Sequence, residues 1–271
     1  MHTVADPVAA QSRLLDIKRH GLRVGFVPTM GFLHEGHLSL MRLARTRCDH
    51  LVASIYVNPL QFGPNEDLDQ YPRDLERDTA LCESVGVDTL FVPTDLYDGD
   101  HSTTVRVQGL TDGLCGASRP GHFDGVTTVV ARLFGIVQPD VAVFGEKDYQ
   151  QLAVIRRMVR DLCLPIEIVG GPLVRDVDGL ALSSRNKYLD ASERSRALTL
   201  FAALQAIANS GSPSASERVA IGRRIVQADS VDYISIVHPS SLKPLETIDG
   251  PARALVAAHV GSTRLIDNIG L

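Results

Sequence analysis

The chain has 271 residues, of which 44% are apolar and 22% charged, a composition typical of a globular protein with a substantial core. Its net charge is −5 and its basic residues are scattered singly, which argues against a nucleic-acid or anionic-lipid partner. No apolar stretch approaches the roughly 18 to 20 residues of a membrane span, and the N-terminus lacks an apolar signal core. We therefore expect a cytoplasmic protein that acts on small molecules and has no membrane partner.

Four cysteines lie far apart in the sequence and form no C-x-x-C pair. This spacing suggests neither a zinc site nor a disulfide framework, so we expect mostly buried thiols. Cys115 lies in a glycine-rich stretch and stays open as a catalytic candidate. The other three are Cys48, Cys82 and Cys163.

Short β-branched runs alternate with longer stretches of helical period in the first part of the chain. This alternation predicts an α/β fold in which helices cover both faces of a parallel sheet. The expected strands are residues 23–27, 51–57, 88–92, 141–144 and 166–169. The expected helices between them are residues 37–47, 125–137 and 149–162. We expect a Rossmann-like domain over residues 1–173.

The pattern changes after about residue 173. A helix over 192–208 with Ser192 as its N-cap is expected, followed by a serine-rich linker at 210–216 and a helix over 217–228. Three strands with alternating apolar positions then follow, and we expect them to be antiparallel. They cover residues 231–238, 252–259 and 263–269. These elements predict a smaller C-terminal α+β domain over residues 174–271.

Residues 28–37 join the first expected strand to the first expected helix, which is where open α/β sheets bind their ligands. Gly31 and Gly36 let a phosphate approach the backbone closely, and the helix start offers free N–H groups and a positive dipole end. His34 and His37 are three residues apart, so both rings could face the same phosphate bridge and stabilise developing charge. A capped helix with surface histidines is the plainer alternative; a metal pair is less favoured because no third ligand is evident.

Two more segments carry phosphate-binding side chains. In the segment 144–148, which ends a strand and opens a helix, Lys147 offers a point charge. Asp148 there would cap the helix or help to organise a magnesium ion. In the segment 182–186, two hydroxyls and Arg185 could wrap a triphosphate from the opposite side, although a simple polar turn would look the same.

Together with two further segments, these motifs make the chain resemble the pantothenate synthetase (pantoate–β-alanine ligase) family. That family belongs to the HIGH-type nucleotidyltransferases, which are related to class I aminoacyl-tRNA synthetases. The matches are P-T-M-G-x-L-H-x-G-H at 28–37, V-N-P-x-Q-F at 57–62, R-P-G-H-F-x-G-V at 119–126, F-G-E-K-D-x-Q-Q at 144–151 and L-S-S-R-N at 182–186. The departures are Phe32, where the family often has Ala, and Leu182, where many relatives have Met.

The resemblance implies that ATP and (R)-pantoate give pantoyl adenylate and diphosphate, and that β-alanine then attacks the acyl carbon and releases AMP and pantothenate. It also implies Mg²⁺ with the ATP, and a homodimer.

The resemblance further implies the residue roles. His37 would be the proton donor with His34 beside it, and Lys147 and Arg185 would complete the catalytic set. Gln61 would bind pantoate and β-alanine, and Gln151 would bind pantoate. The implied ATP site comprises Met30, Gly31, Phe32, Leu33, His34, Glu35, Gly36, His37, Gly145, Glu146, Lys147, Asp148, Val174, Leu182, Ser183, Ser184 and Arg185.

Physical chemistry refines some of these roles. A histidine at a helix N-terminus beside Lys147 has its cationic form disfavoured, so His37 is expected to act as a neutral hydrogen-bond donor. The amide of Gln61 can both donate and accept, which suits a hydroxy acid. Pro59 should end the preceding strand and project Asn58, Gln61 and Phe62 into the cleft. Tyr71 and Arg119 would cover that cleft, although Arg119 would serve equally as a structural ion-pair partner.

Other functions stay open on the sequence. A nucleotidyltransferase that acts on a phosphorylated alcohol would use the same histidines, but the segments 57–62 and 119–126 argue against it. A relic of a tRNA synthetase should show a basic RNA-binding surface. A non-catalytic nucleotide sensor would keep the glycines but lose Lys147, Arg185 or a histidine, and all of these are present.

Overall fold

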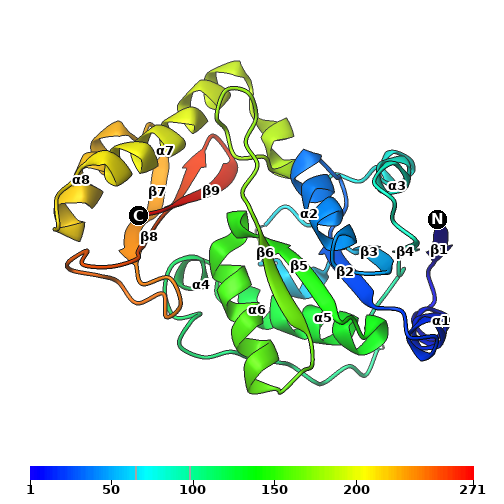
Figure 1. Ribbon diagram of the computed structural model, residues 1–271. Helices are drawn as coiled ribbons and strands as arrows, with labels where there is room; N and C mark the ends of the chain where they lie inside the picture. Colours follow the sequence, from blue (N-terminus) through cyan, green and yellow to red (C-terminus); the bar gives the residue numbers. More distant parts are fainter. Residues whose placement is uncertain (65, 98) are drawn as a thin grey trace.

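The computed structural model describes residues 1–64, 66–97 and 99–271 and contains two sheets (Figure 1). The larger sheet is parallel, with the strand order β1-β4-β3-β2-β5-β6. Its strands are β1 (His2–Val4), β2 (Val24–Thr29), β3 (His50–Ile55), β4 (Thr89–Phe91), β5 (Val141–Gly145) and β6 (Glu167–Gly171). The chain fills one side of β2 with β3 and β4 and then crosses to β5, so the topological switch point lies between β2 and β5. Open α/β sheets bind ligands at this crevice.

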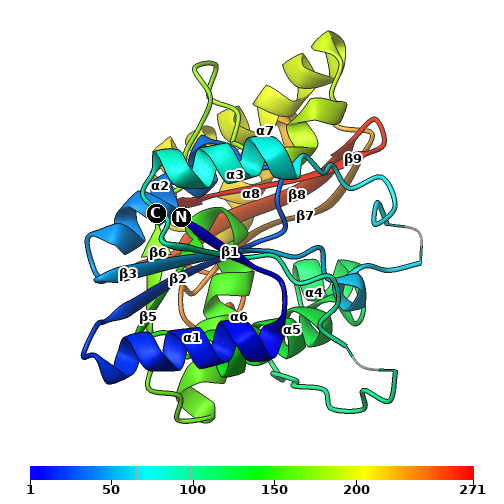
Figure 2. The same cartoon turned by 90° about the vertical axis from the view of Figure 1, so that its right-hand side faces the viewer.

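Helices cover both faces of the parallel sheet (Figure 2). On one face, α1 (Pro7–Arg19), α5 (His122–Val137) and α6 (Tyr149–Asp161) bury apolar side chains in a common core. On the other face, α2 (Glu35–Arg45) and α3 (Leu75–Ser84) close a second core with Leu38, Met41 and Cys82. The short elements are α4 (Cys115–Ser118) and the 3₁₀ turns η1 (Pro59–Gln61), η2 (Glu146–Asp148) and η3 (Ser184–Tyr188). This doubly covered sheet confirms the Rossmann-like expectation.

The C-terminal part forms a three-stranded antiparallel sheet in the order β7-β8-β9. The strands are β7 (Ser230–Val237), β8 (Arg253–Val260) and β9 (Thr263–Gly270). Two helices, α7 (Ala191–Asn209) and α8 (Ala215–Ile225), pack with this sheet around a separate core that includes Leu204, Ile207 and Val256. The expected smaller α+β unit is therefore present.

Several expected boundaries were wrong. Helix α7 is capped by Asp190, whose carboxylate accepts a hydrogen bond from the Glu193 amide at 2.7 Å, and Ser192 lies inside the helix. Helix α8 begins earlier than expected, after its N-cap Ser214. Strand β3 stops at Ile55, before the predicted end at residue 57. These shifts are small because periodicity locates an element better than its ends.

Some elements were not anticipated at all: β1, α1, α3 and α4. The expectation that the cysteines are mostly buried also holds only in part, because Cys82 and Cys115 are buried whereas Cys48 is half-buried and Cys163 is exposed. No helix in the described part of the chain is both long and apolar enough to cross a membrane.

Candidate active site

Two connected cavities lie at the carboxyl edge of the parallel sheet, next to the C-terminal sheet. The first has a volume of about 230 Å³ and the second about 650 Å³. The sequence-predicted residues that line the first cavity are Met30, His34, Gly36, His37, Asn58, Gln61, Tyr71, Arg119, Gly145, Lys147, Asp148, Gln151, Val174, Leu182, Ser183, Ser184 and Arg185. Segments separated by more than 100 residues thus converge on one cavity.

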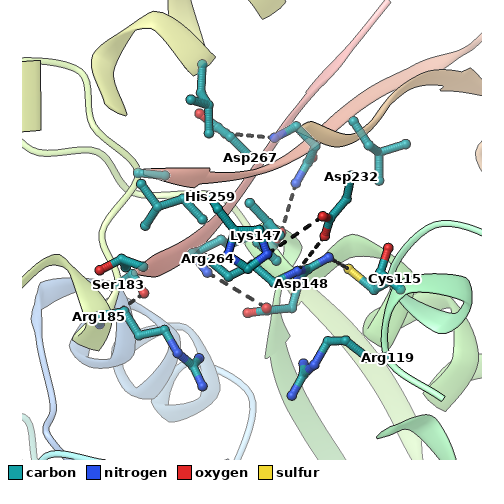
Figure 3. Close-up of a pocket in the computed structure, with 18 of the residues that line it drawn as sticks. Cys115, Arg119, Lys147, Asp148, Ser183, Arg185, Asp232, His259, Arg264 and Asp267 are labelled. Atoms are coloured by element: carbon teal, nitrogen blue, oxygen red, sulfur yellow. Dashed lines mark hydrogen bonds and ion pairs between the residues drawn. The ribbon is translucent and has the colours of Figure 1, made fainter. Parts of the chain in front are cut away.

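The second cavity opens between the two sheets and shares part of its lining with the first. The shared residues are Arg119, His122, Lys147, Asp148, Gln151, Ser183 and Arg185. Figure 3 looks into the second cavity, whose lining also includes residues of the C-terminal sheet, among them Asp232, His259 and Arg264. A ligand in the first cavity can therefore be approached by a second ligand from the second one.

Five residues of the expected ATP site are not placed on the described lining of either cavity. They are Gly31, Phe32, Leu33, Glu35 and Glu146. The Leu33 side chain is 0% exposed and packs in the core beneath α2. Glu35 pairs with Arg42 on the surface, and Glu146 pairs with Arg253 at 3.1 Å. These side chains take part in local packing and ion pairs.

The turn that enters α2 is held by a carboxylate that the sequence did not reveal. Asp78 of α3 is buried, and its oxygens accept hydrogen bonds from the amides of Phe32 at 2.6 Å and Leu33 at 2.7 Å. Gly31 has a φ of 84°, and a Cβ there would lie 3.0 Å from Asp78 Oδ2. Glycine is thus required both by the backbone angle and by this contact. Asp78 therefore fixes the backbone immediately before His34.

His34 and His37 form a compact pair at the start of α2, with ring centroids 4.1 Å apart. His34 occupies the N-cap position, and its backbone N–H donates to His37 Nδ1 at 3.3 Å. This bond leaves the proton of a neutral His37 ring on Nε2, as a hydrogen-bond donor. Burial, the neighbouring His34 and Lys147 all lower the pKa of His37 well below its usual value. These influences favour the neutral ring of His37, which presents its Nε2–H as a donor.

The His34 ring is also held neutral. Burial, followed by the charge of Lys147, lowers its pKa to about 4. Its Nδ1 is a buried atom without a hydrogen-bond partner in the described structure. A buried polar atom left unpaired costs free energy, so this nitrogen is suited to a bound ligand.

Lys147 and Asp148 lie in η2, between β5 and α6, and both line the two cavities. The Lys147 ammonium lies 3.8 Å from the Asp148 carboxylate. Asp148 occupies the N-cap position of α6, but its side chain makes no capping hydrogen bond. Its carboxylate is 46% exposed, so it is available to a cation. No cluster of three or more His, Cys, Asp or Glu side chains that could hold a metal occurs among the described residues.

Two arginines in the site are paired with carboxylates of the loop that follows η1. Arg185 forks onto Asp67, with nitrogen–oxygen distances of 2.9 and 2.7 Å. Arg119 contacts Glu66 in the same way, which is the ion-pair alternative expected for it. Both arginines line both cavities, where an anionic ligand could compete with these carboxylates.

Gln61 is fixed by a network that runs from η1 to α5. Its amide contacts Met30 Sδ at 3.1 Å and accepts a hydrogen bond from Asn58 Nδ2 at 3.1 Å. Asn58 also donates to the carbonyl of Gly125 at 3.1 Å. His122 was not assigned a role from the sequence; Arg119 donates to its Nε2 at 3.0 Å, so its Nδ1 donates to the carbonyl of Gln61 at 2.8 Å. Asn58 and Met30 therefore hold the side-chain amide of Gln61, and His122 holds its main-chain carbonyl.

Cys115 takes part in a polar cluster beside the second cavity (Figure 3). Its Sγ lies 3.0 Å from Tyr233 Oη and 3.5 Å from Arg264 Nη2. Its backbone N–H donates to Gln150 Oε1 at 2.9 Å. These contacts give Cys115 a structural position between α4 and the C-terminal sheet.

Three histidines with lowered pKa values, the buried His122 and the partly buried His34 and His37, should make the stability fall on acidification. Burial is the main cause that lowers the pKa values of His34 and His122 to about 4 and that of His37 well below its usual value. Below pH about 6.5 the unfolded chain therefore binds protons that the folded chain excludes. The contribution is complete above pH 6.5 and decreases as the pH falls from 6.5 toward 4.

We expect His122→Asn to reduce this pH dependence, because Asn can retain the donor to Gln61 without titrating. Urea unfolding between pH 6.5 and 5 should show a slope of unfolding free energy against pH that is smaller by up to about 1.4 kcal/mol per pH unit. Between pH 7.5 and 8.5 neither state protonates the ring, so the two slopes should agree there. Equal slopes in the acidic range would contradict a neutral, buried His122.

Comparison with known proteins identifies the family of the chain. The sequence model described as pantoate-beta-alanine ligase matches residues 2–270. The chain belongs to the pantoate–β-alanine ligase family. Members of this family from Syntrophotalea carbinolica and Moorella thermoacetica, both named pantothenate synthetase, are 54% and 53% identical to the chain. The alignments cover 99% and 97% of this chain and 98% and 96% of the relatives.

Solved structures of the pantoate–β-alanine ligase family share the fold. The crystal structure of pantothenate synthetase from Thermus thermophilus has a TM-score of 0.94 at 51% identity and covers 99% of both chains. The crystal structure of pantoate-beta-alanine ligase from Francisella tularensis, complexed with beta-gamma ATP and beta-alanine, has a TM-score of 0.83 at 33% identity. It covers 99% of this chain and 97% of its own.

Proposed function

We propose that the chain joins (R)-pantoate to β-alanine at the expense of ATP, forming pantothenate, AMP and diphosphate. The observation that carries this proposal is the convergence of His34, His37, Lys147 and Arg185 on a cavity that Gln61 and Gln151 also line. Family membership over almost the whole chain supports the same reaction. The relative that was crystallised with beta-gamma ATP and beta-alanine supports two of the substrates.

In the first step, a pantoate carboxylate oxygen attacks the α-phosphorus of ATP. A bond from that oxygen to phosphorus forms, the bond from phosphorus to the bridging oxygen breaks, and diphosphate leaves. His34 and His37 at the N-terminus of α2 would donate hydrogen bonds to the phosphates, where negative charge develops. Lys147 would add a point charge, and Arg185 would exchange Asp67 for phosphate oxygens.

The residues of the expected ATP site fall into two groups, those whose side chains could contact ATP directly and those that would act through the backbone or by positioning. Residues with side chains on the lining would contact ATP directly, and Met30, Val174 and Leu182 among them offer apolar surface. Gly31, Phe32, Leu33, Glu35 and Glu146 would contribute through the backbone or through positioning. The proposal keeps all of them as ATP-site residues.

Magnesium would enter with ATP as part of the substrate. Mg²⁺ usually takes one or two protein carboxylates in addition to phosphate oxygens and water. Asp148 is the carboxylate on the described lining of the first cavity, so it is the residue that would hold the ion. When bound, the ion would neutralise charge on the departing diphosphate.

In the second step, the β-alanine amine attacks the acyl carbon of pantoyl adenylate. The carbon–nitrogen bond forms, the carbon–oxygen bond to AMP breaks, and the amine loses a proton. Gln61 and Gln151 would orient pantoate, and Gln61 would also contact β-alanine. Because the mixed anhydride hydrolyses in water, the C-terminal unit would serve as a lid over the site.

We also propose that residues 1–173 and 174–271 are the two domains, because the six strands of the parallel sheet and the three of the antiparallel sheet fall on opposite sides of this boundary. The cytoplasmic location and the homodimer stay proposals that rest on family membership. Transfer to a phosphorylated alcohol is the less favoured reaction, because the whole chain matches the ligase family.

Product analysis tests the proposed reaction. With ATP, Mg²⁺, (R)-pantoate and β-alanine, we expect pantothenate, AMP and diphosphate in equal amounts, and little AMP when pantoate is omitted. The control replaces β-alanine with α-alanine at the same concentration. Formation of ADP and phosphate, or nucleotide turnover that does not depend on pantoate, would contradict the proposal.

A further inference from the structure

Asn268 of β9 reaches across from the C-terminal sheet to the backbone of the site. Its side-chain nitrogen donates hydrogen bonds to the carbonyl oxygens of Glu146 at 2.9 Å and Lys147 at 3.0 Å. The residue is 5% exposed, so water does not compete strongly for these bonds. A side-chain amide has two N–H donors, and both are used here. The contact therefore joins two elements about 120 residues apart in the sequence.

The two carbonyls belong to the peptide groups on either side of the Lys147 Cα. The planes of these two peptide groups together define the direction in which Cβ leaves Cα. By holding both planes, Asn268 sets the direction in which the Lys147 side chain starts. That side chain lines both cavities.

The neighbouring strand strengthens this contact. Arg253 of β8 pairs with Glu146 at 3.1 Å, and its guanidinium lies 4.0 Å from the centroid of the Tyr149 ring. The C-terminal sheet therefore contacts η2 and Tyr149, the first residue of α6, through several interactions. These interactions are the hydrogen bonds of Asn268 to the backbone, the ion pair of Arg253 with Glu146 and the cation–π contact of Arg253 with Tyr149.

Asn268 is itself rigidly held. Its backbone N–H donates to Asp267 Oδ1 at 2.7 Å, and the Asp267 carboxylate accepts a forked contact from Arg175. The Arg175 guanidinium lies 3.4 Å from the centroid of the Phe201 ring in α7. The Asp267 side chain is only 4% exposed. These contacts link the backbone of Asn268 through Asp267 and Arg175 to helix α7.

We propose that Asn268 is a positioning residue for Lys147, and that it makes the placement of this lysine depend on the docked C-terminal sheet. The inference rests on the proposed function, in which Lys147 contacts the phosphates of ATP. Without the Asn268 side chain, Lys147 should stay in the site, but its side chain should point in a different direction. A displacement of about 1 Å can lower a rate by about 10²-fold.

A double-mutant cycle tests this role. We expect Asn268→Ala to reduce the affinity for β,γ-methylene ATP and to lower kcat of pantoate-dependent diphosphate exchange by about 10- to 100-fold. In a Lys147→Ala background the same substitution should have almost no further effect, because its target is gone. Asn209→Ala, at an exposed residue that ends α7, is the control and should match the wild type.

The outcomes distinguish a positioning role of Asn268 from a general structural role, and both from a failure of the proposed function. Losses that multiply in the double variant, in binding or in exchange, would assign Asn268 a general structural role and overturn the inference. If Asn268→Ala does not fold, Asn268→Asp serves instead, because it keeps the side-chain shape but places a carboxylate against two carbonyl oxygens. The affinity of this variant for β,γ-methylene ATP should fall. An affinity equal to that of the wild type would overturn the inference. A wild-type protein that binds the analogue but catalyses no exchange would refute the proposed function, while the binding cycle would still decide the role of Asn268.

Discussion

Lys147→Ala is expected to lower kcat of pantoate-dependent adenylate formation by about 10²- to 10³-fold, the usual cost of removing one preorganised charge-stabilising group. The ammonium of Lys147 lies on the lining of both cavities and touches Asp148 only loosely, at 3.8 Å. Its charge is therefore available to the phosphates of ATP in the proposed reaction. The measurement is the rate of exchange of labelled diphosphate into ATP, with pantoate present and β-alanine absent.

The matched control is Lys243→Ala, at an exposed lysine outside both described linings. It should exchange diphosphate at the wild-type rate. Circular dichroism of both variants should match the wild type, because the Lys147 side chain makes no short ion pair among the described residues. Exchange at the wild-type rate in Lys147→Ala would remove this lysine from the catalytic set.

Gly125→Ala is expected to damage both stability and activity, although alanine normally favours a helix. A Cβ at this position would overlap the carbonyl group of Leu60 and lie 2.6 Å from the amide nitrogen of Gln61. Helix α5 and η1 must then separate, at a cost of about 1–3 kcal/mol for overpacking. The shift would also move Gln61, so kcat/KM for pantoate should fall by about 10²-fold.

Helix α5 supplies its own control in Gly135, where a Cβ would meet no atom within 4 Å. Gly135→Ala should raise the free energy of unfolding by up to about 1 kcal/mol and leave kcat/KM unchanged. Urea unfolding and initial rates with varied pantoate measure both effects. If Gly125→Ala behaved like Gly135→Ala, the close approach of η1 to α5 would not control the pantoate site.

The sequence predicted the elements that have strong apolar patterns. The buried strands β2, β3 and β5 and the helices α5 and α6 were found because their apolar residues recur with clear periods. Strand β1 has only three residues at the sheet edge, which is too short for a pattern. Helix α3 buries only Asp78 and Cys82, so it carries no apolar stripe.

The sequence also predicted that the main site segments lie together, because parallel strands end at one edge of the sheet; the roles that the motif resemblance implies for their residues stay predictions. It did not find the residues that act through distant contacts. Asp78 lies 46 residues from the amide of Phe32, and Asn268 lies 121 residues from the carbonyl of Lys147. No local spacing encodes such pairs; only the burial of a polar group against a particular backbone reveals them.

The fate of a labelled oxygen tests the central claim most directly. The protein would be supplied with ATP, Mg²⁺, β-alanine and (R)-pantoate that carries ¹⁸O in its carboxylate. Adenylate formation predicts that one labelled oxygen moves into the phosphate of AMP for each pantothenate formed, because the acyl carbon–oxygen bond breaks in the second step. Unlabelled AMP, or label in inorganic phosphate together with ADP, would contradict the account.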